Sequence, residues 1–136
     1  MPDAPTPNRH PLLDRREVLA VCIGGIVGAV LRTAIAGRLP HDPDAWPWAT
    51  FLVNLGGTFV LGVAVTAIHE RRAFFRRLIA TGFCGALTTF STMQLEVLRM
   101  LDANANGLAA GYLGASIALG LVCVLVGSGL GRRWPA

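Results

Sequence analysis

Four long apolar stretches constrain the fold of this 136-residue chain more than any other feature. They run over residues 18–39, 48–68, 78–100 and 108–130. A helix rises about 1.5 Å per residue, so each stretch can cross roughly 30 Å of hydrocarbon. The segments between them are too short for a globular insertion. The sequence therefore predicts an all-α integral membrane protein with four transmembrane helices, and any function must lie among those helices.

Charged residues lie mainly outside the apolar stretches. They make up 15% of the chain, the net charge is +4, and every basic residue other than histidine is arginine. Arginines that flank apolar stretches are typical of membrane anchors, so no nucleic-acid partner is expected. We divide the chain into a polar N-terminal tail (residues 1–17), a four-helix membrane channel domain (18–131) and a basic C-terminal tail (132–136). The expected location is the cell membrane, with several passes through the lipid bilayer.

Polar residues inside the spans are the candidates for function, because hydrocarbon offers them no hydrogen-bond partners. They are concentrated in the third stretch, where Gly82 and Gly85 precede the run Thr88-Thr89-Phe90-Ser91-Thr92. Glycines and β-branched residues weaken a helix, so we expect the third helix to be broken near its middle. Carbonyls freed at such a break can coordinate a hard cation, while hydroxyls and aromatic edges suit a small anion.

Small residues recur at helical spacing in three of the spans. The pairs are Gly24 with Gly28, Thr58 with Gly62, and Gly107 with Gly111, which Ala115 extends. Such spacing lets helix backbones approach closely, so we expect tight packing and a subunit interface. Four helices of this length use up their interior in packing. A conduction path therefore needs a second subunit or a groove at the surface of the chain.

Three motifs make the chain resemble the Fluc/CrcB family of fluoride channels over residues 18–130. The first is GGIVGAVLR, which ends at Arg32, and the second is TFLVNLGGTF, which begins at Thr50. The third and most specific is GFCGALTTFST, which begins at Gly82 and is followed by Glu96. Their order and spacing within a four-span chain carry the resemblance.

The resemblance implies a fluoride-selective channel that passively exports cytoplasmic fluoride and so reduces its toxicity. It also implies an antiparallel dimer with two fluoride paths and a central Na⁺ that is not transported. The backbone carbonyls of Gly85 and Thr88 would hold that Na⁺. The implied fluoride path contains Asn54, Phe90, Ser91, Thr92, Met93, Tyr112 and Ser116. Arg32 and Glu96 are expected to be structural polar residues, and no residue is expected to be catalytic.

One position departs from the family pattern. Met93 stands where the family usually has a second phenylalanine, three residues after Phe90. Methionine fills similar space and is polarizable, but it offers no ring edge to an anion. We expect transport to survive this change, with an altered rate or selectivity.

Two other classes of membrane protein fit part of the sequence. A small dimeric drug/proton antiporter also has four short helices, but it needs a carboxylate inside the membrane. Here Glu17 lies at the edge of the first span and Glu96 late in the third. A non-transporting assembly subunit would explain the glycines but not the run of hydroxyls. An enzyme is disfavoured, because no nucleophile–base pair or metal cluster is present.

The arginines also predict an orientation. With the amino end in the cytoplasm, nine of the twelve basic residues lie on that side and only Arg38 and Arg99 lie opposite, with Arg32 inside the membrane. An antiparallel homodimer requires insertion in both directions, which needs nearly balanced loops. The partner is therefore either a second copy of this chain, inserted against the arginine bias, or a paralogue of opposite orientation. The arginine placement favours the paralogue.

Overall fold

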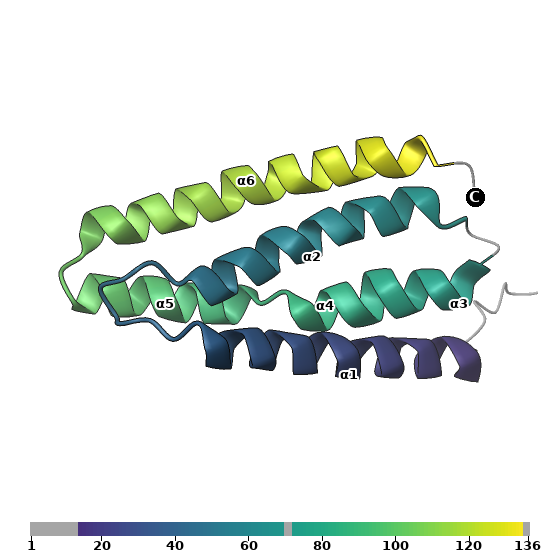
Figure 1. Cartoon of the computed structure of the whole chain (residues 1–136), viewed down its shortest axis with the longest axis horizontal. Helices are drawn as coiled ribbons and strands as arrows, with labels where there is room; N and C mark the ends of the chain where they lie inside the picture. The colour runs from purple at the N-terminus through teal and green to yellow at the C-terminus, as the bar shows by residue number, and fades with distance from the viewer. Residues whose placement is uncertain (1–13, 70–71, 135–136) are drawn as a thin grey trace, which may run out of the picture.

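The computed structural model describes residues 14–69 and 72–134, and within them every regular element is a helix. Four spans are long and apolar enough to cross a membrane: α1 (Arg15–Arg38), α2 (Trp48–Ala67), a composite span (Ala73–Asp102) and α6 (Asn106–Arg132). Figure 1 shows them side by side, with successive spans running in opposite directions. The predicted all-α, four-span fold is confirmed. Most of the predicted N-terminal tail, Arg71 and the last two residues lie outside the described part.

The third span is broken, as the sequence predicts. It contains α3 (Ala73–Arg76), the π-helix η2 (Arg77–Phe83), α4 (Cys84–Leu87) and α5 (Phe90–Asp102). Between α4 and α5, Thr88 has ψ 152° and Thr89 has φ −149° and ψ 113°, so both are extended. The Thr89 side chain caps α5 by accepting a hydrogen bond from the Thr92 backbone N–H at 3.2 Å. The π-helix was not predicted, and such segments often lie near functional sites.

Glycines bring the helices together in two pairs. In the pair formed by α1 and the third span, a Cβ at Gly24 or Gly28 would strike backbone atoms of η2. In the pair formed by α2 and α6, Gly62 lies against the backbone of α6, and Gly127 against that of α2. Of the small-residue pairs in the sequence, Gly24, Gly28 and Gly62 therefore make contacts between helices within the chain. Gly107 and Gly111, by contrast, have open space above them.

Gly127 and Gly129 provide a matched test of this packing, because both lie on α6. We expect Gly127→Ala to lower the free energy of unfolding by about 1–3 kcal/mol, because the new Cβ would meet the Phe59 carbonyl oxygen. Gly129→Ala adds a methyl group in open space and should leave stability nearly unchanged. Thermal unfolding of both variants in the same detergent measures the difference. Equal melting temperatures would show that α2 and α6 are not in backbone contact at Gly127.

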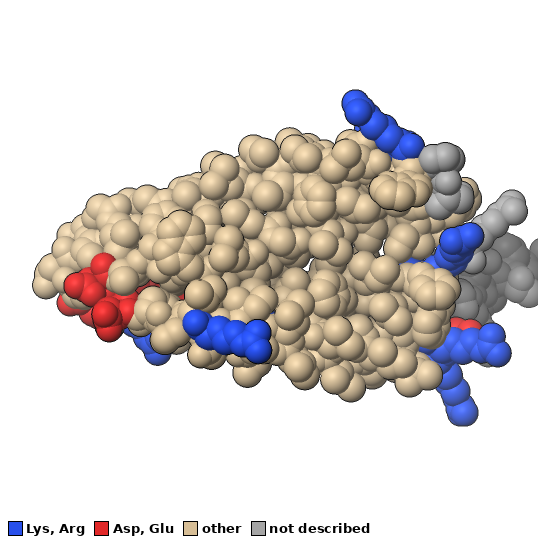
Figure 2. Space-filling view, viewed as in Figure 1, with Lys and Arg blue, Asp and Glu red and all other residues tan. Residues whose placement is uncertain are grey.

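The two ends of the bundle differ in charge. Figure 2 shows arginines gathered at the end where α1 begins and α6 finishes, and acidic side chains gathered at the other. At the basic end, Arg77 Nε and Glu17 Oε2 lie 2.8 Å apart and join η2 to α1. At the other end, a buried cluster of Phe51, Met93, Met100, Ala109 and Tyr112 joins α2, α5 and α6. This cluster fixes α5 beyond the break.

Candidate functional site

The break in the third span is held by one side chain of α2. Asn54 Oδ1 accepts the Thr89 backbone N–H at 2.8 Å, and Asn54 Nδ2 donates to the Thr89 carbonyl at 3.1 Å. The amide therefore makes the two hydrogen bonds that a neighbouring strand would make with an extended residue. Irregular backbone at membrane depth survives only where protein or a cavity satisfies it. Asn54 supplies that support from across the helix interface.

The hydrogen bond from the Thr89 N–H to Asn54 also leaves the Gly85 carbonyl without its usual helical donor. In an uninterrupted helix, the Thr89 N–H would donate to the Gly85 carbonyl four residues earlier. Here that N–H is committed to Asn54, while the Thr88 N–H still donates to the Cys84 carbonyl at 3.0 Å. The extended ψ of Thr88 also turns its carbonyl away from the helical direction. Gly85 is exposed, with nothing within 4 Å of the place where a Cβ would stand.

A surface groove of about 440 Å³ runs beside the break, between α2, the third span and α6. Its walls are mainly apolar, with a few polar groups from Asn54, Thr58, Thr88 and Thr89. Four of the predicted fluoride-path residues line it: Asn54, Phe90, Met93 and Ser116. Phe90 is 67% exposed, so its ring is available to the groove and to whatever covers it. The groove is open along the side of the chain.

The other three residues of the predicted path lie elsewhere. Ser91 is exposed at the start of α5 and Thr92 is half-buried, with its hydroxyl 2.8 Å from that of Thr89. Tyr112 is fully buried in the core. Met93, although it lines the groove, is also a core residue with 5% exposure. The structure therefore gathers four of the seven predicted residues along one groove, while Ser91, Thr92 and Tyr112 do not line it.

Arg32 lies in a second, smaller pocket on another side of the break. This pocket of about 200 Å³ is lined by residues of α1, α2 and the start of α5, including Thr33, Thr50, Thr89 and Thr92. Thr89 lines both this pocket and the groove, so the break separates them. The groove itself contains no arginine. A neutral groove suits passage of an anion, because a full positive charge in a constriction would hold it too tightly.

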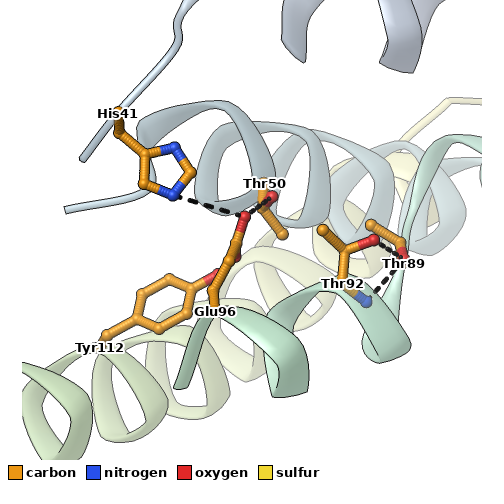
Figure 3. Close-up of polar contacts among 6 residues, drawn as sticks. All are labelled: His41, Thr50, Thr89, Thr92, Glu96 and Tyr112. Carbon is orange, nitrogen blue, oxygen red and sulfur yellow. Dashed lines mark hydrogen bonds and ion pairs between the residues drawn. The ribbon is translucent and has the colours of Figure 1, made fainter. Parts of the chain in front are cut away.

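Glu96 is buried in a network that connects three helices (Figure 3). Its side chain is 4% exposed and accepts hydrogen bonds from the Thr50 hydroxyl at 2.5 Å and the Tyr112 hydroxyl at 2.7 Å. His41 Nε2, from the loop between α1 and α2, lies 4.0 Å from Glu96 Oε1. A buried carboxyl is tolerated only with such partners. The sequence indicated Glu96 as a structural polar residue but gave no sign that Thr50 and Tyr112 are its partners.

We expect Tyr112→Phe to lower the free energy of unfolding by about 1–2 kcal/mol, since it removes one donor to a buried carboxyl. Thr33→Val is the matched control, because the exposed Thr33 hydroxyl only bonds the Ala29 carbonyl of its own helix. Thermal unfolding in detergent compares the two with the unmodified chain. If Tyr112→Phe lowers the melting temperature no more than Thr33→Val does, the hydrogen bond from Tyr112 to Glu96 does not contribute to stability.

No group of three or more His, Cys, Asp or Glu side chains lies close enough to bind a metal ion within the described ranges, residues 14–69 and 72–134. A four-span protein with an interrupted helix beside a neutral groove has the architecture of a small membrane channel or transporter.

Comparison with known proteins identifies the family within that class. Residues 19–128 match the family described as CrcB-like protein, Camphor Resistance (CrcB), and the chain belongs to this family. A Mycolicibacterium paratuberculosis protein named fluoride-specific ion channel FluC 1 is 48% identical over 88% of this chain and 93% of its own length. A Mycobacterium tuberculosis protein of the same name is 46% identical over the same shares.

A more distant relative carries a similar name. The Methanococcus aeolicus protein named fluoride-specific ion channel FluC is 42% identical over 65% of this chain and 73% of its own length. All three relatives are named as ion channels, which agrees with the sequence interpretation that disfavours an enzyme. With its four spans, the chain is a multi-pass membrane protein.

Proposed function

We propose that this protein is a fluoride-selective channel through which cytoplasmic fluoride leaves the cell passively. The observation that carries the proposal is the broken third span beside a neutral groove, in a chain whose relatives are named fluoride-specific ion channels. HF is a weak acid that crosses membranes uncharged and ionises in a near-neutral cytoplasm. An open path for the anion then lets trapped fluoride flow out without an energy source.

The groove supports this chemistry through the groups it presents. Fluoride must exchange water for donors of similar strength, and hydroxyls, amide N–H groups and aromatic edges are such donors without a full charge. Asn54 has a second N–H besides the one given to Thr89, and the Phe90 ring is exposed beside it. Because the groove is open along its length, a second subunit is needed to close it into a path.

The break also fits a structural Na⁺. The Gly85 and Thr88 carbonyls would hold the ion, since one has lost its helical donor and the other is turned out of the helix. A hard cation takes more oxygen ligands than these two, so a second subunit that meets the first at the exposed Gly85 would complete the set. The ion would supply a fixed positive charge that joins the two subunits.

The antiporter alternative gains no support from the two candidate carboxylates. Glu96 accepts hydrogen bonds at both of its oxygens, and Glu17 is paired with Arg77. Neither lines the groove. Proton exchange requires a carboxylate that meets both the substrate and water. These two are instead engaged in contacts between helices.

Ion fluxes from liposomes that contain the purified protein test the proposal. We expect fluoride efflux to be fast, chloride efflux to be slow, and a cationic dye to be retained. A Na⁺ gradient should not drive fluoride uphill, because the proposed Na⁺ does not move. Coupling of fluoride flux to Na⁺, or dye transport coupled to protons, would overturn the channel assignment.

Phe90→Ile is expected to reduce fluoride efflux by about tenfold or more, equivalent to about 1.4 kcal/mol in the barrier. The substitution keeps an apolar side chain in the groove but removes the ring edge. Met93→Phe restores the usual family residue and should leave efflux intact or raise it. Efflux is measured with a fluoride electrode, and gel filtration verifies that the variants assemble. Unchanged efflux in Phe90→Ile would remove Phe90 from the path.

A further inference from the structure

A second groove lies at the basic end of the bundle, between the end of α2 and the start of the third span. Its volume is about 460 Å³. The lining residues are Val63, Ala67 and Ile68 from the end of α2, Arg72, Phe75 and Ile79 from the third span, and Trp134 beyond α6. Apart from Arg72, every one of these side chains is apolar or aromatic.

This basic-end groove faces away from the groove at the break. Asn54 and Thr58 line the break groove and lie one turn apart on α2. Successive helical residues are rotated by about 100°, so Val63 lies roughly 140° around the helix from Thr58. Ala67 is one turn beyond Val63 and shares its face. A second subunit that covers the break groove therefore leaves the basic-end groove facing lipid.

The basic-end groove combines apolar walls with one cation and two exposed aromatic rings. Arg72 is exposed and makes no ion pair with any residue in the described ranges. Phe75 is 57% exposed and Trp134 is 73% exposed. Aromatic rings of this kind mark the level of lipid headgroups, where arginine also meets phosphate. Figure 2 shows further arginines at the same end, so the local field favours an anion.

We propose that the basic-end groove binds an anionic phospholipid. Its phosphate pairs with the Arg72 guanidinium, and one acyl chain lies along Val63, Ala67 and Ile79. Free phosphate would use the guanidinium but leave the apolar walls exposed, and a zwitterionic lipid would bring a cation close to Arg72 together with its phosphate. Only an amphiphilic anion matches both parts of the groove. The site does not depend on what the protein conducts.

Quenching of Trp134 by brominated lipids tests the proposal in the full-length chain. The protein is placed in phosphatidylcholine vesicles with increasing brominated phosphatidylglycerol or brominated phosphatidylcholine. Subtracting the signal of a Trp134→Phe variant isolates Trp134 from the tryptophans near α2. We expect about fivefold tighter apparent binding of the phosphatidylglycerol, the preference that one arginine near the surface provides.

Variants separate this site from general attraction to a basic surface. Arg72→Gln should abolish the preference and Arg72→Lys should keep most of it, because lysine retains the charge. Arg132→Gln is the matched control, since Arg132 lies at the same end but does not line the groove. Ala67→Phe fills the groove and should reduce quenching by both lipids. Circular dichroism and gel filtration confirm that each variant is folded.

Four results would overturn the assignment. Equal quenching by the two lipids would mean that the groove recognises only the apolar chains. If Arg132→Gln lost the preference for phosphatidylglycerol as fully as Arg72→Gln, the attraction would be to the basic surface as a whole. Undiminished quenching by both lipids in Ala67→Phe would place the lipid outside the groove. Displacement of the brominated lipid by soluble glycerol phosphate would show that the site recognises phosphate alone.

Discussion

Asn54→Asp is expected to lower fluoride efflux by at least about tenfold while the subunits still assemble. The change replaces the amide N–H that faces the Thr89 carbonyl with a carboxylate oxygen, so an attraction becomes a repulsion at the break. It also places a negative charge in the groove. Two unit charges about 4 Å apart at an effective dielectric of 20 repel by about 4 kcal/mol, more than a tenfold loss requires. Fluoride-electrode measurements on liposomes give the ratio.

Asn54→Ala separates the effect of the lost hydrogen bonds from the effect of the added charge. It removes both hydrogen bonds to Thr89 without adding charge, so it disturbs the break but does not repel the anion. We expect an intermediate loss of efflux for Asn54→Ala and the larger loss for Asn54→Asp. Equal losses would mean that Asn54 acts only by holding the break. Normal efflux in both variants would place the fluoride path away from Asn54.

The break in the third span could be predicted because its cause is local. Gly82, Gly85 and two consecutive threonines each weaken a helix, and hydropathy shows that this happens at membrane depth. The position of the break, at Thr88 and Thr89, agrees with that expectation. Asn54 and Thr58 are four residues apart, which puts both on one face of a helix, and both line the break groove. Local chemistry and helical periodicity are sufficient for features of this kind.

The partners across helices could not be predicted, since they depend on how the helices are rotated against one another. Thr50 is one hydroxyl among many in the sequence, yet its contact with Glu96 requires α2 and α5 to meet at one particular register. Tyr112 matched the implied fluoride path in sequence, but its hydroxyl is bound to Glu96 in the core. The π-helix likewise has no clear signature in residues 77–83. Tertiary packing determines these details.

The polar and aromatic residues of the spans therefore fall into two groups with different roles. One group holds the structure: Asn54 fixes the break, and Glu96 connects three helices through hydroxyls. The other presents groups to the open groove, with Phe90 the most exposed of them. Asn54 belongs to both groups, which is why its substitution has the larger expected effect. Substitutions of Glu96 partners should act on stability before they act on conduction.

The charge difference between the ends of the bundle bears on how the chain inserts. Seven described arginines lie at the end where α1 begins, and only Arg38 and Arg99 lie at the other end apart from Arg32 within the span. The seven are Arg15, Arg16, Arg72, Arg76, Arg77, Arg132 and Arg133. Cytoplasmic loops carry such an excess, so the amino end should remain in the cytoplasm. In the antiparallel arrangement that the family resemblance implies, the groove would then be closed by a paralogue of opposite orientation.

Labelling of single cysteines at the two ends is expected to show one orientation only. In a chain whose three native cysteines are replaced by alanine, His69→Cys should react with an impermeant maleimide only after the cells are opened. Ala103→Cys, at the opposite end of the third span, should react in intact cells and serves as the matched control. The expected result is all-or-none, because a strong arginine bias leaves few molecules inverted. Labelling of both positions in intact cells would demonstrate insertion in both directions and favour a homodimer over a pair of paralogues.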